Sequence, residues 1–401
     1  MPEAVIVATA RTAIGRAMKG SLTTIRPDDL TAQVVEAVFA KVPQLDRNLV
    51  EDLVLGCGQP AGESGVNLAR VVAVLADMPN VPGVTINRYC SSSLQAIRMS
   101  AHAIKAGEGD IFLAAGVETV SRFINGMADD GPANERFNDA RARTAARQAG
   151  DQGAWTPPVG LPDVYMGMGD TAENVAEIEN VSREDQDAFA ARSQQLATEN
   201  LESGFWEAEI TPVTLPDGTV VAKDDGIRPG TTVEKLAGLN PVFRPGGSVT
   251  AGNACPLNDG AAAVVIMSDT KAKELGLTPL ARIVSTGVSG LSPEIMGLGP
   301  IEAVKKALAN AKMAIGDIDL YEINEAFAVQ VLGSARELGM DEDKLNVSGG
   351  AIALGHPFGM TGARITATLL NNLTTYDKTF GIETMCVGGG QGMAMVLERL
   401  N

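Results

Sequence analysis

The hydrophobic positions of this 401-residue chain form short apolar runs that alternate with longer segments of helical spacing. In the N-terminal part the runs predict strands at 4–10, 52–56 and 111–116, and the spacing predicts helices at 28–40 and 91–106. Strands that alternate with helices are typical of α/β architecture, in which helices cover the faces of a sheet.

The C-terminal part repeats this order of elements. Strands are predicted at 281–288 and 318–324, helices at 300–311 and 361–373, and a last strand with a glycine-rich turn at 379–392. The match is weak residue by residue, but the sequence of elements is the same. We therefore predict an internal duplication of two similar α/β halves related by a pseudo-twofold axis.

A different stretch, residues 121–249, separates the two halves. It contains both tryptophans, 11 basic and 21 acidic residues, and a helix that Ser182 caps and Gly204 closes. Long insertions in compact folds are often functional, so we interpret it as a loop domain over the first half that covers the active site. The alternative is a solvated excursion. The predicted domains are an N-terminal half, the loop domain and a C-terminal half, at 1–120 plus 250–271, 121–249 and 272–401.

Composition and charge exclude several classes of protein. With 45% hydrophobic residues the chain has enough apolar surface for a core, which excludes disorder as its main state. The net charge of −17 makes nonspecific nucleic-acid binding a poor hypothesis. The longest apolar run, 261–267, is too short for a membrane span, and the N-terminus lacks a basic signal-peptide region. We therefore expect a cytoplasmic protein.

The chain has four cysteines and two histidines, and no CxxC spacing. This pattern favours neither a disulfide framework nor a zinc site, so we expect no metal. Cys90 lies between an apolar strand and a helix, where the helix N-terminus should lower its pKa and favour a nucleophilic thiolate. The alternative for Cys90 is a small buried residue. His102, inside a helix, is predicted to be structural.

Three other sites could carry chemistry. His356 lies in a glycine-rich stretch and is either a general base or a hydrogen-bonded turn residue. Cys386 precedes a GGGQG turn whose N–H groups could stabilise an oxyanion, and which does not match a dinucleotide-binding loop. Asn324, at the end of a strand, could hold a water or cap a helix. If the halves face each other, Cys90 would meet His356 and Cys386.

Five motifs then identify a resemblance over essentially the whole chain. They are NRYCSSSLQA (87–96), GNACPLNDGAAA (252–263), NEAFA (324–328), GGAIALGHPFGMTGAR (349–364) and CVGGGQG (386–392). Together they resemble the thiolase family, and most of all its degradative 3-ketoacyl-CoA thiolases, or acetyl-CoA C-acyltransferases. The resemblance implies two βαβαβαββ halves in a five-layered αβαβα core with an inserted loop domain. It also implies a homodimer or homotetramer, with coenzyme A as substrate and no metal or organic cofactor.

The resemblance also assigns roles to residues of this chain. Cys90 is the nucleophile that becomes acylated, and His356 activates it. Cys386 is the second acid/base, which protonates the acetyl-CoA carbanion and deprotonates incoming CoA. Backbone N–H groups of Cys90 and Gly388 match one oxyanion hole, and His356 with a water held by Asn324 matches the other.

The expected CoA contacts follow from the same resemblance. Arg228 matches an arginine of the loop domain that meets the nucleotide, and Met168, Ala251 and Cys255 are the further contacts. Cys255 departs from the family pattern, which has a serine there, and a thiol is the weaker hydrogen-bonding group. The segment 165–176 lacks a histidine found in many acetoacetyl-CoA thiolases, which favours the degradative subgroup.

The leading functional hypothesis is therefore thiolytic cleavage of 3-oxoacyl-CoA in fatty-acid or related acyl degradation. The alternative of the same class is condensation of two acetyl-CoA to acetoacetyl-CoA. A different class, a non-catalytic acyl-CoA or lipid-binding relative, would not need Cys90, Asn324, His356 and Cys386 together. A β-oxidation hydratase or dehydrogenase is a partner that the resemblance allows.

Overall fold

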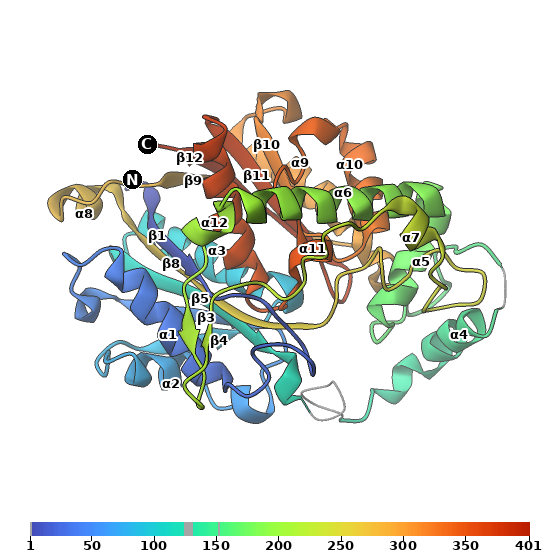
Figure 1. The fold of residues 1–401 in the computed structure, drawn as a ribbon, viewed down its shortest axis with the longest axis horizontal. Helices are drawn as coiled ribbons and strands as arrows, with labels where there is room; N and C mark the ends of the chain where they lie inside the picture. Colours follow the sequence, from blue (N-terminus) through green and yellow to red (C-terminus); the bar gives the residue numbers. More distant parts are fainter. Residues whose placement is uncertain (1, 124–130, 151–152) are drawn as a thin grey trace.

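The computed structural model describes residues 2–123, 131–150 and 153–401, and it contains every strand and helix that the hydrophobic pattern predicts, with small shifts at their ends (Figure 1). The first half contains β1 (Ala4–Arg11), β2 (Gly15–Arg16), α1 (Pro27–Ala40), β3 (Asp52–Cys57), α2 (Leu68–Leu75), β4 (Gly83–Ile86), α3 (Ser92–Ala106), β5 (Ile111–Thr119) and β8 (Asn258–Ser268). After α8 (Asp269–Glu274), the second half contains β9 (Ala281–Gly290), α9 (Gly299–Ala311), β10 (Leu320–Ile323), α10 (Ala328–Leu338), α11 (Ala351–Leu354), α12 (Thr361–Thr375), β11 (Phe380–Val387) and β12 (Gln391–Arg399).

The strands of both halves join in one mixed sheet of order β10-β11-β12-β9-β1-β8-β5-β3-β4, with β2 paired to β8. The halves meet where β1 pairs with β9 through Val5 and Ile6 alone. In the first half β3 runs parallel to β4 and β5, and β8 runs antiparallel to β5 and β1. The second half repeats this arrangement, except that the counterpart of β4 is reduced to a single bridge between Tyr321 and Leu345.

Three hydrophobic cores hold five layers together, as the resemblance implies, and the central core encloses the middle helical layer. Helices α1 and α2 cover the outer face of the first half, α9 and α10 cover the outer face of the second, and α3 and α12 lie between the two halves of the sheet (Figure 1). Successive side chains of a strand point to opposite faces, so the side chains of β8 pack alternately in two cores. Ala263 and Val265 pack in the outer core of the first half, whereas Val264 and Ile266 pack in the central core.

The two central helices approach each other closely near their N-termini. A Cβ atom on Gly362 of α12 would lie 2.1 Å from the backbone nitrogen of Leu94 on α3, so only glycine fits there. The backbone N–H of Ala363 donates to the Ser93 hydroxyl at 2.9 Å. This contact brings together the two turns that precede the helices, one with Cys90 and the other with His356.

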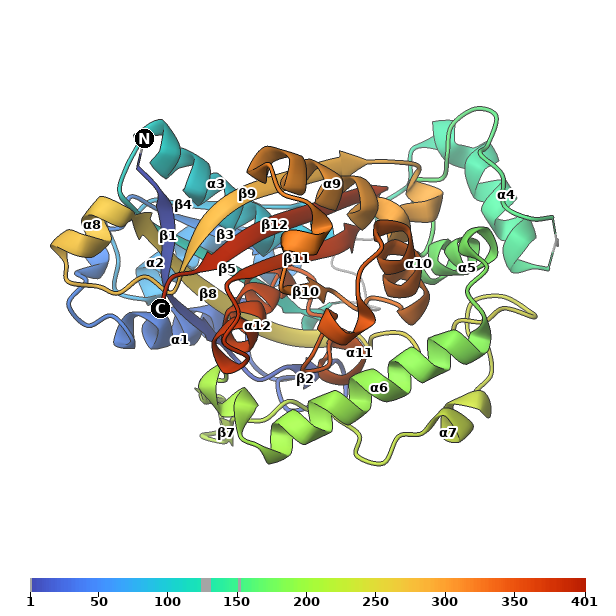
Figure 2. The same ribbon diagram turned by 90° about the horizontal axis from the view of Figure 1, so that it is seen from above.

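The inserted segment contains α4 (Asn138–Gln148), α5 (Met168–Glu179), α6 (Arg183–Glu202), β6 (Val213–Thr214), β7 (Val220–Val221) and α7 (Val233–Ala237). Ser182 caps α6 as predicted, accepting from the N–H of Asp185 at 3.0 Å. The insertion covers both halves rather than the first half alone. Val213, Leu215 and Val221 around β6 and β7 pack in the outer core of the first half, as expected. In contrast to the expectation, α5 packs on α10, and α6 runs along α10 and α11 of the second half (Figure 2). The reason is the apolar side of α5, which packs in the outer core of the second half. Residues 124–130 and 151–152 of the predicted loop domain lie outside the described residues.

Among the described residues, every helix is too short or too polar to cross a bilayer.

Candidate active site

Cys90 lies in a 3-10 turn, Tyr89–Ser91, between β4 and the N-terminus of α3. Tyr89 has a φ of 45°, a left-handed conformation that bulky residues rarely adopt, and such strain is concentrated at functional sites. The Cys90 side chain is half-buried and lines a cavity of about 350 Å³. Gly388 and Met168 line the same cavity, so the structure brings these three predicted site residues together.

The expectation of a lowered Cys90 pKa is wrong for the free protein. Burial raises the pKa of this thiol to about 11, and the nearby Glu118 carboxylate adds to the rise. The backbone N–H of Gly388 faces the sulfur and lowers the pKa, but by less than burial raises it. Cys90 is therefore a neutral thiol at neutral pH, with the N–H group of Gly388 already directed at it.

His356 is held in one tautomer by its neighbours. Its Nδ1 lies 2.6 Å from the Thr361 hydroxyl, and that hydroxyl donates to the carbonyl of Pro357 at 2.8 Å. A hydroxyl has a single proton to donate, so Nδ1–H must donate to Thr361. The lone pair then lies on Nε2, which faces the Asn324 Nδ2 at 3.4 Å.

The His356 imidazole is neutral as well. The side chain is 1% exposed, and burial, together with the charge on Arg364, lowers its pKa to about 3. A neutral imidazole with a free lone pair on Nε2 can accept a proton from a thiol. The free site therefore holds a thiol and an imidazole rather than a thiolate–imidazolium pair.

Asn324 and Cys386 lie at the carboxyl ends of two neighbouring parallel strands, β10 and β11. The backbone N–H of Asn324 donates to the carbonyl of Thr384 at 3.0 Å, which fixes the two strand ends side by side. Cys386 is fully buried, and burial raises its pKa well above the ordinary value, with further contributions from Cys90 and Cys255. Cys386 is thus a neutral thiol near Cys90, able to donate a proton.

Two buried charged residues at the site were missed by sequence reasoning. Glu118 accepts backbone N–H groups from Gly58 at 2.8 Å, Gln59 at 3.2 Å and Gly359 at 2.8 Å, and thereby ties a loop of the first half to the turn after His356. Burial raises its pKa to about 7.

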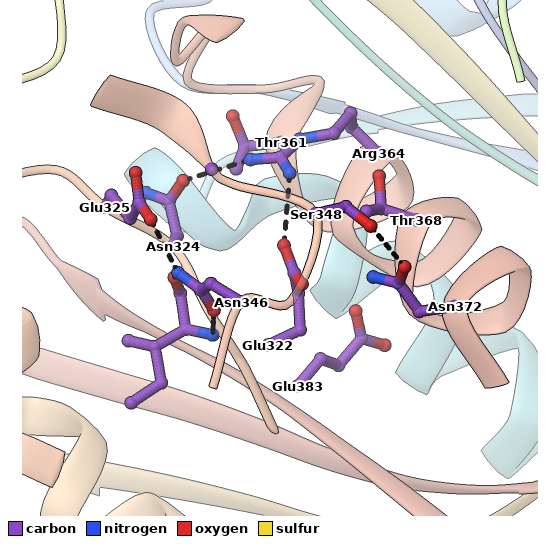
Figure 3. A network of polar contacts seen from close by, with 12 residues as sticks. Glu322, Asn324, Glu325, Asn346, Ser348, Thr361, Arg364, Thr368, Asn372 and Glu383 are labelled. Carbon is purple, nitrogen blue, oxygen red and sulfur yellow. Dashed lines mark hydrogen bonds and ion pairs between the residues drawn. The ribbon is translucent and has the colours of Figure 1, made fainter. Parts of the chain in front are cut away.

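The other missed residue is Arg364 of α12, which lies in a buried polar network beside Asn324 and Glu322 (Figure 3). In a sequence, a charged residue in an amphipathic helix, such as Arg364, or near the end of a strand, such as Glu118, predicts a solvated position, so no local signal marked either residue as buried.

The predicted CoA contacts fall in different places. Cys255 is half-buried, its backbone N–H donates to Ala326 at 3.0 Å, and the nearby Cys90 is one cause of its raised pKa. Ala251 and Arg228 are exposed and do not line the cavity at Cys90. Burial and the charge of Arg16 lower the pKa of Arg228, and among described residues no carboxylate forms an ion pair with either arginine.

No cluster of three His, Cys, Asp or Glu side chains suited to a metal ion occurs within 2–123, 131–150 and 153–401.

A duplicated α/β fold with a thiol at a helix N-terminus, a facing backbone N–H and a neutral imidazole defines a thiol-dependent acyltransferase. Comparison with known proteins supports this class. The family model of the thiolase N-terminal domain matches residues 4–270, and that of the thiolase C-terminal domain matches 277–399. The chain belongs to the thiolase family.

Relatives and solved structures agree with this membership. The chain is 44% identical to a 3-ketoacyl-CoA thiolase of Bacillus subtilis, over 99% of this chain and 100% of that protein. It is also 44% identical to a 3-oxoadipyl-CoA/3-oxo-5,6-dehydrosuberyl-CoA thiolase of Escherichia coli, over the whole of both chains. The dimeric peroxisomal thiolase of Saccharomyces cerevisiae superimposes with a TM-score of 0.88 at 36% identity, over 100% of this chain and 98% of that one.

Proposed function

We propose that this thiolase cleaves 3-oxoacyl-CoA with CoA, giving acetyl-CoA and a shortened acyl-CoA through an acyl-Cys90 intermediate, in fatty-acid or related acyl degradation. The observation that carries the proposal is that the Gly388 N–H and the buried Cys386 lie beside the Cys90 thiol. The neutral His356 lies in the turn that Glu118 ties to the first half of the site. A reverse Claisen cleavage needs these four groups: a nucleophile, an oxyanion donor, a base and an acid.

In the first half-reaction, the Cys90 sulfur attacks the 3-oxo carbon while its proton passes to Nε2 of His356. The bond between C2 and C3 then breaks, and its electron pair forms the enolate of acetyl-CoA. The Cys386 thiol protonates C2, and acetyl-CoA leaves. The raised pKa of Cys386 suits this role, because the group must begin as a proton-carrying thiol.

In the second half-reaction, the Cys386 thiolate takes the proton of incoming CoA. The CoA sulfur attacks the acyl-Cys90 carbonyl, whose oxygen is stabilised by the N–H groups of Cys90 and Gly388. The Cys90 sulfur leaves and recovers its proton from His356. Both residues are then back in the neutral state that the free protein has, so the cycle is closed without an external acid, base or cofactor.

The cavity beside Cys90 favours an apolar acyl chain. Its walls include Val164, Met166, Met168 and Phe358, and no charged side chain is among the described residues that line it. A dicarboxylic acyl group, such as the one in the name of the E. coli relative, would bury its carboxylate there without a partner, which is costly. We therefore propose a hydrocarbon chain as the preferred acyl group.

The proposed nucleotide site of CoA lies around Arg228. Burial, and then the charge of the nearby Arg16, lowers the pKa of Arg228. Neither arginine side chain forms an ion pair among the described residues. In a chain of net charge −17, two neighbouring arginines whose side chains form no ion pair among the described residues give a local positive site that suits phosphate, although Asp225 accepts the backbone N–H of Arg16.

We also propose a homodimer that forms at the free edge of β4. This strand ends the sheet order, and an unpaired edge is a template for another strand. Exposed apolar side chains lie on the neighbouring segments, at Val66, Val74, Leu75 and Met99. Light scattering should give a dimer or a multiple of it, and Val74→Glu with Met99→Glu should shift the protein toward monomer.

The test of function is CoA-dependent cleavage across 3-oxoacyl-CoA substrates of increasing chain length, with Cys90→Ala as the control. We expect activity to persist beyond acetoacetyl-CoA and an acylated Cys90 to be seen by mass spectrometry. Activity on acetoacetyl-CoA alone would support the biosynthetic reaction instead. Full activity in the Cys90→Ala variant would exclude the mechanism.

A further inference from the structure

The amide of Asn324 must point one way for the site to work. Its Nδ2 faces Nε2 of His356, and a water held by this amide is the proposed second oxyanion donor. If the amide were flipped, its oxygen would face the lone pair of Nε2, and two acceptors would repel each other. Something in the structure must therefore fix the amide orientation.

Arg364 is the group that does so. It is 1% exposed, and its Nη2 lies 3.5 Å from Oδ1 of Asn324 while Nη1 lies 3.3 Å from a carboxylate oxygen of Glu322 (Figure 3). A guanidinium can only donate hydrogen bonds, so Arg364 donates to the amide oxygen of Asn324, and the amide nitrogen cannot take its place on this side. The nitrogen is then directed at His356.

The same helix also fixes His356. Thr361 and Arg364 are three residues apart on α12, so they lie on one side of the helix. Thr361 sets the tautomer of His356, and Arg364 sets the orientation of Asn324. Thr361 and Arg364 therefore fix which atom donates and which accepts at both groups around Nε2, namely the imidazole of His356 and the amide of Asn324.

A purely structural role explains Arg364 poorly. Its Nε is buried without a hydrogen-bond partner among the described residues, and a buried ion pair is often no more stable than well-packed apolar side chains. The contact with Asn324 gives the buried guanidinium a function, orienting the amide, that an apolar side chain could not perform. We propose that Arg364 is a positioning residue for the enolate-forming step, acting through Asn324 on the second oxyanion hole.

This inference rests on the proposed thiolase reaction, and it separates the two half-reactions. Transfer of an acetyl group between Cys90 and CoA uses the backbone N–H groups at Cys90 and Gly388. Cleavage of the carbon–carbon bond also needs the enolate oxygen to be stabilised beside Asn324. Loss of Arg364 should therefore slow cleavage far more than acetyl exchange.

The experiment compares Arg364→Lys and Arg364→Met with wild type in two assays. One assay measures cleavage of acetoacetyl-CoA by CoA, and the other measures exchange of labelled CoA into acetyl-CoA. We expect kcat for cleavage to fall by about 10²-fold, as for loss of one oxyanion donor, with KM nearly unchanged. Exchange should fall by less than about 5-fold. Lysine keeps a positive charge beside Glu322, so Arg364→Lys is the variant expected to fold best.

Glu383→Gln is the matched control, because Glu383 belongs to the same buried network but does not contact Asn324 or His356. The Thr366 hydroxyl is within 2.8 Å of the Gly362 carbonyl and 2.9 Å of Glu383, so its one proton cannot serve both. Glu383 is therefore the donor and carries a proton, in line with the strong rise that burial causes in its pKa. Glutamine keeps this donor, and both assays should stay near wild type.

A double variant supplies the decisive comparison. If Arg364 acts through Asn324, then Asn324→Ala with Arg364→Lys should cleave no more slowly than Asn324→Ala alone. Multiplying effects in the double variant, or an equal fall of cleavage and exchange in Arg364→Lys, would overturn the inference. A wild-type protein inactive in both assays would instead contradict the proposed function.

Discussion

The two halves have the same order of elements, but they position their functional groups by different means. In the first half, strand β4, a strained turn and helix α3 place the Cys90 sulfur, and the group that faces it is a backbone N–H. In the second half, side chains determine the site: Thr361 and Arg364 orient His356 and Asn324. A nucleophile needs only a position, whereas a base and an amide also need a defined orientation of donors and acceptors.

The sheet reflects the same difference. The first half has the complete strand β4, whose end leads directly to Cys90. In the second half the equivalent strand is a single bridge at Leu345, and the short helix α11 follows before His356. The two residues have corresponding positions, each in the turn before a central helix, α12 for His356 and α3 for Cys90. His356 is buried, whereas Cys90 is half-exposed.

The largest expected effect comes from removing the nucleophile, which the first half contributes. Cys90→Ala should lower cleavage by about 10⁴-fold or more, because the residual groups can bind but cannot form the thioester. Mass spectrometry after incubation with acetyl-CoA should detect no acylated protein. Cys255→Ser, in the same assay, should still be acylated at Cys90, and its failure would mean that the thiols are assigned wrongly.

Removing Cys386, the proposed acid of the second half, should block the reaction after Cys90 has attacked, at the protonation of C2. In Cys386→Ala the Cys90 sulfur can still be acylated, but C2 has no proton donor. Cleavage should fall by about 10²- to 10⁴-fold, the range for loss of a general acid, while acylated protein still forms. Absence of acylation in this variant would show that both halves are needed for the nucleophile itself.

The pH dependence of Cys90 alkylation tests whether the site is neutral at rest. Iodoacetamide reacts with the thiolate, and below the pKa the thiolate fraction rises tenfold per pH unit. With a pKa of about 11 for Cys90 and about 3 for His356, the rate should rise about 100-fold from pH 7 to pH 9. A plateau between pH 5 and pH 8 would instead indicate a thiolate–imidazolium pair.

The smallest effect is expected far from either half's chemistry. Arg228→Ala should raise KM for CoA by about 10-fold, the loss of one charge-assisted contact to phosphate, and leave kcat nearly unchanged. Arg336→Ala is the control, because Arg336 is also exposed but is paired with Asp185 at 2.9 Å. An unchanged KM in Arg228→Ala would remove Arg228 from the CoA site.

Sequence patterns predicted the elements and the principal thiols and histidine, since apolar periodicity and glycine-rich turns are local signals. They did not predict that the insertion also covers the second half, because packing on α10 depends on contacts between distant segments. They also gave the wrong direction for the pKa of Cys90, since burial outweighs the helix N-terminus and burial is not visible in one strand–helix junction. Arg364 and Glu118 were missed because a buried charge and a solvated one look alike in a sequence.

The position of β8 has a consequence for how the chain is made. This strand fills the gap between β1 and β5, and the whole inserted segment is synthesised before it. Until β8 leaves the ribosome, β1 and β5 have open edges in the growing chain, and such edges can pair with other chains. Pairing across so long a sequence separation is also slow. The nascent N-terminal half is therefore the stage at which this protein is most exposed to aggregation, and it is the part that chaperones would be expected to protect.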